Sequence, residues 1–177
     1  TSWAGEVSVS TATGPVRIRH PRLDMGNAAD ILDGNETTLM RGARDNPFRF
    51  EIAYARPASV AAIEFVLGYM PSYGIAVTVI DGAGRRHAID GRFEGVRGVV
   101  PHPRLAFASP VEDVREIHVT IDDSRPQPVE GAHIHVYDLA HPTLRYAWLE
   151  PDFVHPVIGD IDAIKTYRYK LANFVAE

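Results

Sequence analysis

Hydrophobic and polar residues alternate with a period of two along several short segments of the chain. In the segment 48–54, Phe48, Phe50, Ile52 and Tyr54 are separated by mostly polar residues. The same alternation occurs at 75–79 and at 114–121. Because successive side chains of a strand point to opposite faces of a sheet, this pattern predicts β-strands with one buried face.

Further segments extend this strand pattern. The segment 60–67 is apolar except at Glu64, which is typical of a strand that is covered on both faces. The segments 16–19 and 132–139 bring the total to at least six predicted strands. Loops containing Pro or Gly separate them, at 55–57, 68–74, 94–103 and 122–131. The chain is therefore predicted to be all-β, an antiparallel sandwich or barrel.

The last part of the chain has a different period. Apolar residues between 160 and 175 recur mostly at steps of three and four, and Asp160 is placed to cap a helix. This spacing predicts a C-terminal amphipathic helix, which either docks onto the sandwich or contacts a missing part of a larger protein. The predicted domains are a sandwich over 5–141 and a linker with the helix over 142–177.

Composition excludes several classes of site and partner. The 177 residues carry a net charge of -5 and include no Cys, so disulfides, thiolate zinc sites and cysteine nucleophiles are excluded. With no run of Lys or Arg, neither a nucleic acid nor an anionic membrane is expected as a partner. The longest apolar stretch is too short to insert across a bilayer. Because the chain begins at Thr1, we expect a processed protein or a domain of a longer chain.

Three sequence blocks occur in an order that resembles a known family. The first has Asp33-Gly34-Asn35 after an Ala-containing run, with Thr38 five residues after the Asp and the alternating strand 48–54. The second is the Pro-x-x-Val-x-x-Ile passage at 57–63, and the third is the strand 133–139. Together they resemble the discoidin, or coagulation factor V/VIII type C, family over residues 5–141. The resemblance implies a galactose-binding-like jelly-roll β-sandwich, although Met40 replaces a common aromatic residue.

The last of these strands carries an acid that needs a partner. Asp138 shares a face with Ala132, Ile134 and Val136, so it is predicted to point inward, where an unpaired carboxylate is costly. The resemblance implies a structural calcium, with ligands from Asp33, Asn35, Thr38 and Asp138, which stands where the family usually has Glu. The alternative is that Asp33 closes an Asx turn and Asp138 pairs with an Arg.

Motifs for catalysis are weak. The segment 81–85 has the composition of a hairpin turn and lacks the ending of a phosphate loop, and there is no Gly-x-Ser-x-Gly nucleophile elbow. His133 and His135 share one strand face and could ligate a transition metal in a small metal-dependent enzyme. Histidines on a solvent-facing sheet are the preferred interpretation, and we expect the domain itself not to be an enzyme.

Binding has more support, because sugar recognition needs an aromatic face together with fixed polar donors. The loop 68–74 offers Tyr69 and Tyr73, and the loop after the Asp-Gly turn offers Arg41 and Arg44. The 98–104 stretch adds His102 and Arg104. These six residues are the predicted ligand-binding set, and the alternative for each is loop packing or a solvated charge. Trp3 and Trp148 are expected to anchor the termini by packing.

The resemblance implies a non-catalytic carbohydrate-binding module with a glycan or polysaccharide partner. Such domains accompany glycoside-processing enzymes and envelope glycosyltransferases, so an extracytoplasmic location is expected. The alternative function is that of a protein-interaction or scaffolding domain of the same fold.

Overall fold

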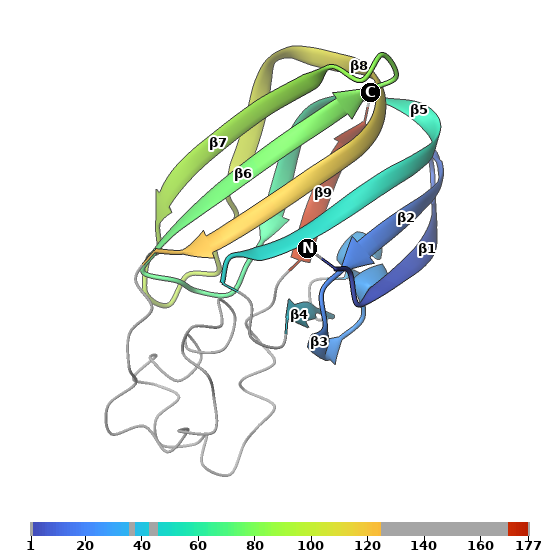
Figure 1. Cartoon of the computed structure of the whole chain (residues 1–177). Helices are drawn as coiled ribbons and strands as arrows, with labels where there is room; N and C mark the ends of the chain where they lie inside the picture. The colour runs from blue at the N-terminus through green and yellow to red at the C-terminus, as the bar shows by residue number, and fades with distance from the viewer. Residues whose placement is uncertain (1, 36–37, 43–45, 125–169, 177) are drawn as a thin grey trace.

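The chain folds into two antiparallel β-layers that face each other across an apolar core (Figure 1). The computed structural model describes residues 2–35, 38–42, 46–124 and 170–176. Its strands are β1 (Gly5–Thr11), β2 (Gly14–His20), β3 (Leu23–Gly26), β4 (Met40–Gly42), β5 (Phe48–Val66), β6 (Ser72–Asp81), β7 (Arg86–Glu94), β8 (Arg104–Asp123) and β9 (Lys170–Ala176). This architecture confirms the predicted all-β sandwich.

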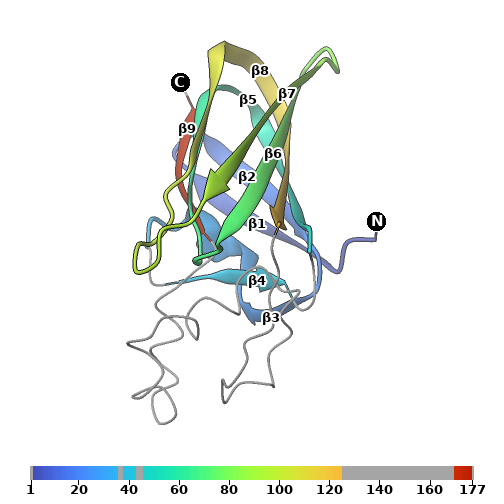
Figure 2. The same ribbon diagram turned by 90° about the vertical axis from the view of Figure 1, so that its left-hand side faces the viewer.

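Two long strands connect the layers. The main sheet has the order β1-β2-β5-β8-β6-β7, with β9 paired to β5, while β3 and β4 form a separate pair. The first part of β5 pairs with the end of β8, and the second part pairs with the beginning of β8, with register shifts between 53 and 62. Both strands therefore bend and serve both layers, as Figure 2 shows. The loop predicted at 55–57 is wrong, because these residues continue β5 through its bend.

The core follows the alternation in the sequence. Phe48, Phe50 and Ile52 of β5 are buried, and so are Ile117 and Val119 of β8, which pair with Ile52 and Phe50. Burial of large apolar side chains from both layers supplies the main stabilisation, at about 1.5–3 kcal/mol for each such side chain. The pattern of apolar positions therefore predicted correctly which face of these strands lies in the core.

The predicted C-terminal helix is wrong where the structure describes it. Residues 170–176 form β9, which pairs antiparallel with the second half of β5 from Val66↔Lys170 to Val60↔Ala176. The edge of β5 offers unpaired backbone N–H and C=O groups, and pairing satisfies them, so tertiary hydrogen bonding overrides the local helical period. The rest of that helix, at 160–169, the strand predicted at 132–139 and the boundary at 141 lie outside the described residues.

Helical structure is sparse in the described ranges. The short 3-10 helix η1 (Ala28–Leu32) leads into the Asp-Gly turn, and it buries Ala28 and Ile31 against the sandwich. In this part of the chain, no helix has the length and apolar character needed to cross a membrane.

Candidate functional site

A groove opens where the sandwich is not closed. β7 hydrogen-bonds to β6 along one edge, and residues 104–106 of β8 hydrogen-bond to β5. Among the described residues, no ladder joins β7 to the beginning of β8, and a groove of about 600 Å³ lies between them. It is at the end of the sandwich that carries the β6–β7 turn and the bend of β8, at the top of Figure 1.

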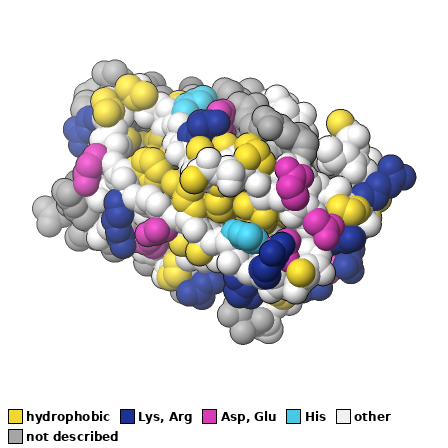
Figure 3. Space-filling model, turned by 90° about the horizontal axis from the view of Figure 1, so that it is seen from above, with side chains coloured by type: hydrophobic (Ala, Val, Ile, Leu, Met, Phe, Trp, Pro, Cys, Tyr) yellow, Lys and Arg dark blue, Asp and Glu magenta, His cyan; other side chains and the backbone are white. Residues whose placement is uncertain are grey.

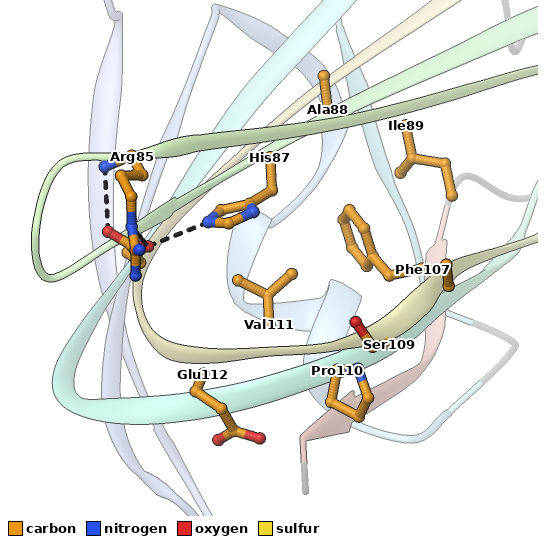
Figure 4. A pocket seen from close by; sticks show the side chains of 11 residues that line it. Arg85, His87, Ala88, Ile89, Phe107, Ser109, Pro110, Val111 and Glu112 are labelled. Atoms are coloured by element: carbon orange, nitrogen blue, oxygen red, sulfur yellow. Dashed lines mark hydrogen bonds and ion pairs between the residues drawn. The ribbon is translucent and has the colours of Figure 1, made fainter.

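The floor of this groove is apolar. Ile89 comes from β7, and Phe107 and Val111 come from β8, so each of these two strands, which do not pair with each other here, contributes side chains to the groove (Figure 4). Val111 is buried, whereas Ile89 and Phe107 pack against the core and remain partly accessible. Seen from above, hydrophobic side chains line a hollow that is surrounded by charged and histidine side chains (Figure 3).

A buried carboxylate fixes the polar wall of the groove. The side chain of Asp81 is 2% exposed, at the end of β6. Its Oδ1 accepts hydrogen bonds from the backbone N–H groups of Ala83 and Arg85, at 2.9 and 3.0 Å. Its Oδ2 lies 2.8 Å from Arg85 Nε and 3.0 Å from His87 Nε2. The hydrogen bonds from His87, Arg85 and Ala83 hold the pKa of Asp81 well below its usual range.

This arrangement orients two donors at the rim. Arg85 uses Nε to hold Asp81 and leaves its side chain 76% exposed, so its terminal nitrogens face solvent. His87 points into the groove beside Val111 (Figure 4). Across the groove, Glu112 accepts a hydrogen bond from the Ser59 hydroxyl at 3.0 Å. Asp81 is satisfied by four hydrogen bonds, so it positions its neighbours rather than exchanging protons with a ligand.

The turn behind this wall is tightly packed. Gly82 donates its backbone N–H to the carbonyl of Asp113 at 2.8 Å. A Cβ at position 82 would lie 2.0 Å from a carboxylate oxygen of Asp113, so a larger residue there would require the Asp113 side chain to move. The β6–β7 turn and the bend of β8 are thereby fixed to each other, and the groove between them has a defined width.

The predicted tyrosine platform lies elsewhere and is covered. Tyr73 belongs to β6, where it shares the inward face with Ile75 and Val77, and its side chain packs 5.4 Å from the ring of Phe93 in a stacked geometry. Only 3% of Tyr73 is exposed, and burial raises its pKa to about 12. Tyr69 is also buried. Neither ring presents an open face to a ligand.

The described members of the remaining predicted binding set are Arg41, His102 and Arg104, and they differ in burial and partners. Arg41 is buried in β4, whereas His102 is exposed on the loop before β8. Arg104 is exposed and forms an ion pair with Glu64 at 3.1 Å. Arg44 lies outside the described residues. The loop before β6 and the loop before β8 lie next to each other, since the backbone N–H of Leu67 donates a hydrogen bond to the carbonyl of Pro101 at 3.0 Å.

The Asp-Gly turn gathers oxygen atoms. Asp33 Oδ1 accepts the backbone N–H of Asn35 at 2.8 Å, which is the Asx turn that the sequence offered as the alternative to a calcium ligand role. The Thr38 hydroxyl lies 2.7 Å from Asp33 Oδ2 and 2.9 Å from the carbonyl oxygen of Asn35. Three of the four predicted calcium ligands are therefore adjacent, and the fourth, Asp138, lies outside the described residues.

The groove residues were not predicted from the sequence. A partial signal existed, because His87, Ile89 and Phe93 alternate with charged residues in the segment after the 81–85 turn. That alternation identifies an inward face but does not show which strand lies opposite it. Phe107 is distant in sequence from this face, and it lies near His87 and Ile89 because β8 bends.

Solved structures share this architecture, although the sequence matches no protein-family model and no curated protein. The family 32 CBM from C. perfringens NanJ, solved in complex with galactose, superposes with a TM-score of 0.52 at 17% identity, over 72% of this chain and 92% of that chain. The chain has the galactose-binding-like fold. A mutant of the Ruminococcus gnavus GH29 fucosidase, in complex with fucose, gives a TM-score of 0.50 at 12% identity over 66% of this chain and 24% of that chain. At these identities the likeness establishes the fold, as the discoidin-like motifs predicted.

Proposed function

We propose that this galactose-binding-like domain is a non-catalytic carbohydrate-binding module whose ligand occupies the groove between β7 and β8. The observation that carries the proposal is the position of the partly accessible Phe107 ring beside donors that are held by Asp81. A sugar has an apolar C–H face and a rim of hydroxyls, so it needs an apolar surface and fixed polar groups next to each other. Arg85 and His87 supply those groups.

The groove suits weak binding by an attached domain. It is open to solvent and binds through few polar side chains, which is typical of a modest affinity for a free sugar. When such a module is tethered to an enzyme, a high effective concentration compensates for weak affinity. We therefore propose that the domain belongs to a larger carbohydrate-active or envelope glycosyltransferase protein that works outside the cytoplasm.

A structural calcium at the Asp-Gly turn is part of the same proposal. Asp33, Asn35 and Thr38 can offer carboxylate, carbonyl and hydroxyl oxygen atoms, which are the donors that calcium prefers, and the Thr38 hydroxyl lies within hydrogen-bond distance of oxygens of the other two. The ion would hold the turn after η1 and take no part in chemistry. Asp138 is the residue expected to complete its ligands.

Calorimetry and a glycan array test the function. Wild-type protein is expected to bind at least one sugar at millimolar concentration, with galactose and fucose, the sugars of the two compared structures, as the first probes. Phe107→Ala should weaken that binding about tenfold, because it removes the aromatic floor. Val96→Ala is the matched control, since Val96 is exposed on another loop. Absence of binding across the array, or equal binding by Phe107→Ala, would contradict the proposal.

The second function to consider is protein docking. Val96 and Val99 are the large hydrophobic residues that are exposed in the described part of the chain, and both lie on the loop between β7 and β8. An apolar loop of this kind favours contact with a protein. If Val96→Ser and Val99→Ser, rather than Phe107→Ala, abolish the binding of the domain to its parent protein, docking is the function.

A further inference from the structure

A second hollow lies on the outer face of the sheet, away from the groove. It has a volume of about 410 Å³ and lies over β5, β8 and β6, with Trp3 at its side. The register places Arg49 opposite Thr120, and His118 opposite Thr78, so side chains of three neighbouring strands meet on this face. The N-terminal segment that carries Trp3 joins the sheet through the hydrogen bond from Ala4 N–H to the carbonyl of His20.

The hollow combines an indole with hydroxyl groups. Trp3 is half-buried, so part of its ring remains accessible beside the sheet. Thr78 and Thr120 line the same space and are also half-buried. An aromatic surface that lies next to short polar side chains can cover one face of a pyranose ring while the hydroxyls bind its edge.

Two arginines give this hollow its charge. Arg49 and Arg86 line it, and within the described residues neither has an acidic side chain within ion-pair distance. The carboxylate of Glu51, which also lines it, lies 3.5 Å from Arg19, which also pairs with Glu6, and 3.7 Å from His118 Nε2. By contrast, Arg85 in the groove is already held by Asp81. The hollow therefore retains two guanidinium groups that can bind an anion.

We propose that this hollow is a second saccharide site and that it takes an acidic sugar, such as a uronic acid unit of a polysaccharide. The sugar carboxylate would pair with Arg49 or Arg86, because a guanidinium and a carboxylate form charge-assisted, bidentate hydrogen bonds. The C–H face of the sugar would lie on Trp3. This site stands apart from the groove, so its existence does not depend on sugar binding there.

Titration with tetragalacturonate, compared with its fully methyl-esterified counterpart, tests the proposal. Wild-type protein is expected to bind the acid form at least about tenfold more tightly than the ester, and added salt should weaken this binding. Trp3→Ala and the double variant Arg49→Gln with Arg86→Gln should each reduce binding of the acid about tenfold or more. Thermal unfolding of both variants, compared with wild type, shows whether they remain folded.

The matched control is Arg56→Gln. Arg56 is an exposed arginine at the bend of β5, and it too has no acidic partner among the described residues. Its replacement removes the same charge from the domain and should leave binding unchanged. Three results would overturn the proposal: no binding of the acid form, equal binding of acid and ester, or a loss in Arg56→Gln as large as that in the double variant. If the protein binds galactose or fucose but not tetragalacturonate, the proposal for this hollow fails and the proposal for the groove between β7 and β8 is unaffected.

Discussion

The imidazole Nε2 of His87 lies 3.0 Å from the buried carboxylate oxygen Oδ2 of Asp81. The same oxygen accepts a hydrogen bond from Arg85 Nε at 2.8 Å, so one carboxylate sets the direction of both polar groups at the rim of the groove. The Asp81 side chain is buried by the fold. The proposed binding surface would therefore be preorganised by a residue that is part of the protein interior.

Replacing Asp81 should change both stability and its dependence on pH. Asp81→Asn leaves Arg85 and His87 less well held, so we expect a melting temperature several degrees lower at neutral pH and weaker sugar binding. Because the pKa of Asp81 is lowered in the folded state, the unfolded chain takes up a proton first as the pH falls. The stability that the ionised group contributes is present above about pH 5 and is lost at lower pH.

Thermal unfolding between about pH 5 and pH 3 measures this effect. Wild type should lose more stability over that range than Asp81→Asn, which has no carboxyl to titrate at this position. Asp90→Asn is the control, since Asp90 is an exposed acid on β7. If the stabilities of wild type and Asp81→Asn change in parallel with pH, the Asp81 carboxylate does not stabilise the folded domain.

Arg85 should matter for ligand affinity and little for folding. Its side chain is mostly exposed, and Arg85→Gln retains a polar side chain at the rim, so the melting temperature should stay close to that of wild type. Loss of a charged donor should weaken sugar binding about fivefold, equivalent to roughly 1 kcal/mol. Isothermal titration calorimetry checks this, with Arg97→Gln, on an exposed loop, as the matched charge control. An equal loss of sugar affinity in Arg85→Gln and Arg97→Gln would show that the net charge of the domain, rather than Arg85 itself, matters for binding.

Tyr73 should act as a core residue. Tyr73→Ala is expected to destabilise the domain by about 3–5 kcal/mol, as for other buried aromatic residues, whereas Tyr73→Phe should retain sugar binding. Burial raises the pKa of Tyr73 to about 12, so wild type should lose stability as the pH rises from about 10 to 12, and Tyr73→Phe should lose less. Urea unfolding at these pH values gives the comparison. A Tyr73→Phe variant that is fully stable but cannot bind sugar would place the hydroxyl in the ligand site.

Calcium should stabilise the domain through the Asp-Gly turn. An ion that binds the folded state alone at one hundred times its dissociation constant adds about 2.7 kcal/mol, so the melting temperature of wild type should rise with calcium. Asp33→Ala should abolish this rise, because it removes the carboxylate nearest to Thr38 and Asn35. Differential scanning calorimetry with calcium, and with magnesium as the comparison ion, measures it. If calcium raises the melting temperature of Asp33→Ala as much as that of wild type, the ion binds at another site.

The fold could be predicted from the sequence because its signals are local. The alternation at 48–54 and 114–121 identified the strands and their buried faces, and the same rule applied to Tyr73 would have placed it inward with Ile75 and Val77. The groove could not be predicted in this way. His87 and Phe107 meet because β7 and the beginning of β8 approach without pairing, and a one-dimensional pattern does not encode that approach. The strand β9 was missed for the same reason, since its partner is distant in sequence.

A sugar that binds between β7 and β8 as proposed would lie against residues of both strands. The most direct measurement is a titration of isotopically labelled protein with galactose or fucose, followed by the chemical shifts of the backbone amides. We expect the largest chemical-shift changes at residues 85–89 and 107–112. Changes confined to the loops at 67–71 and 95–103, or no change at millimolar sugar, would contradict it.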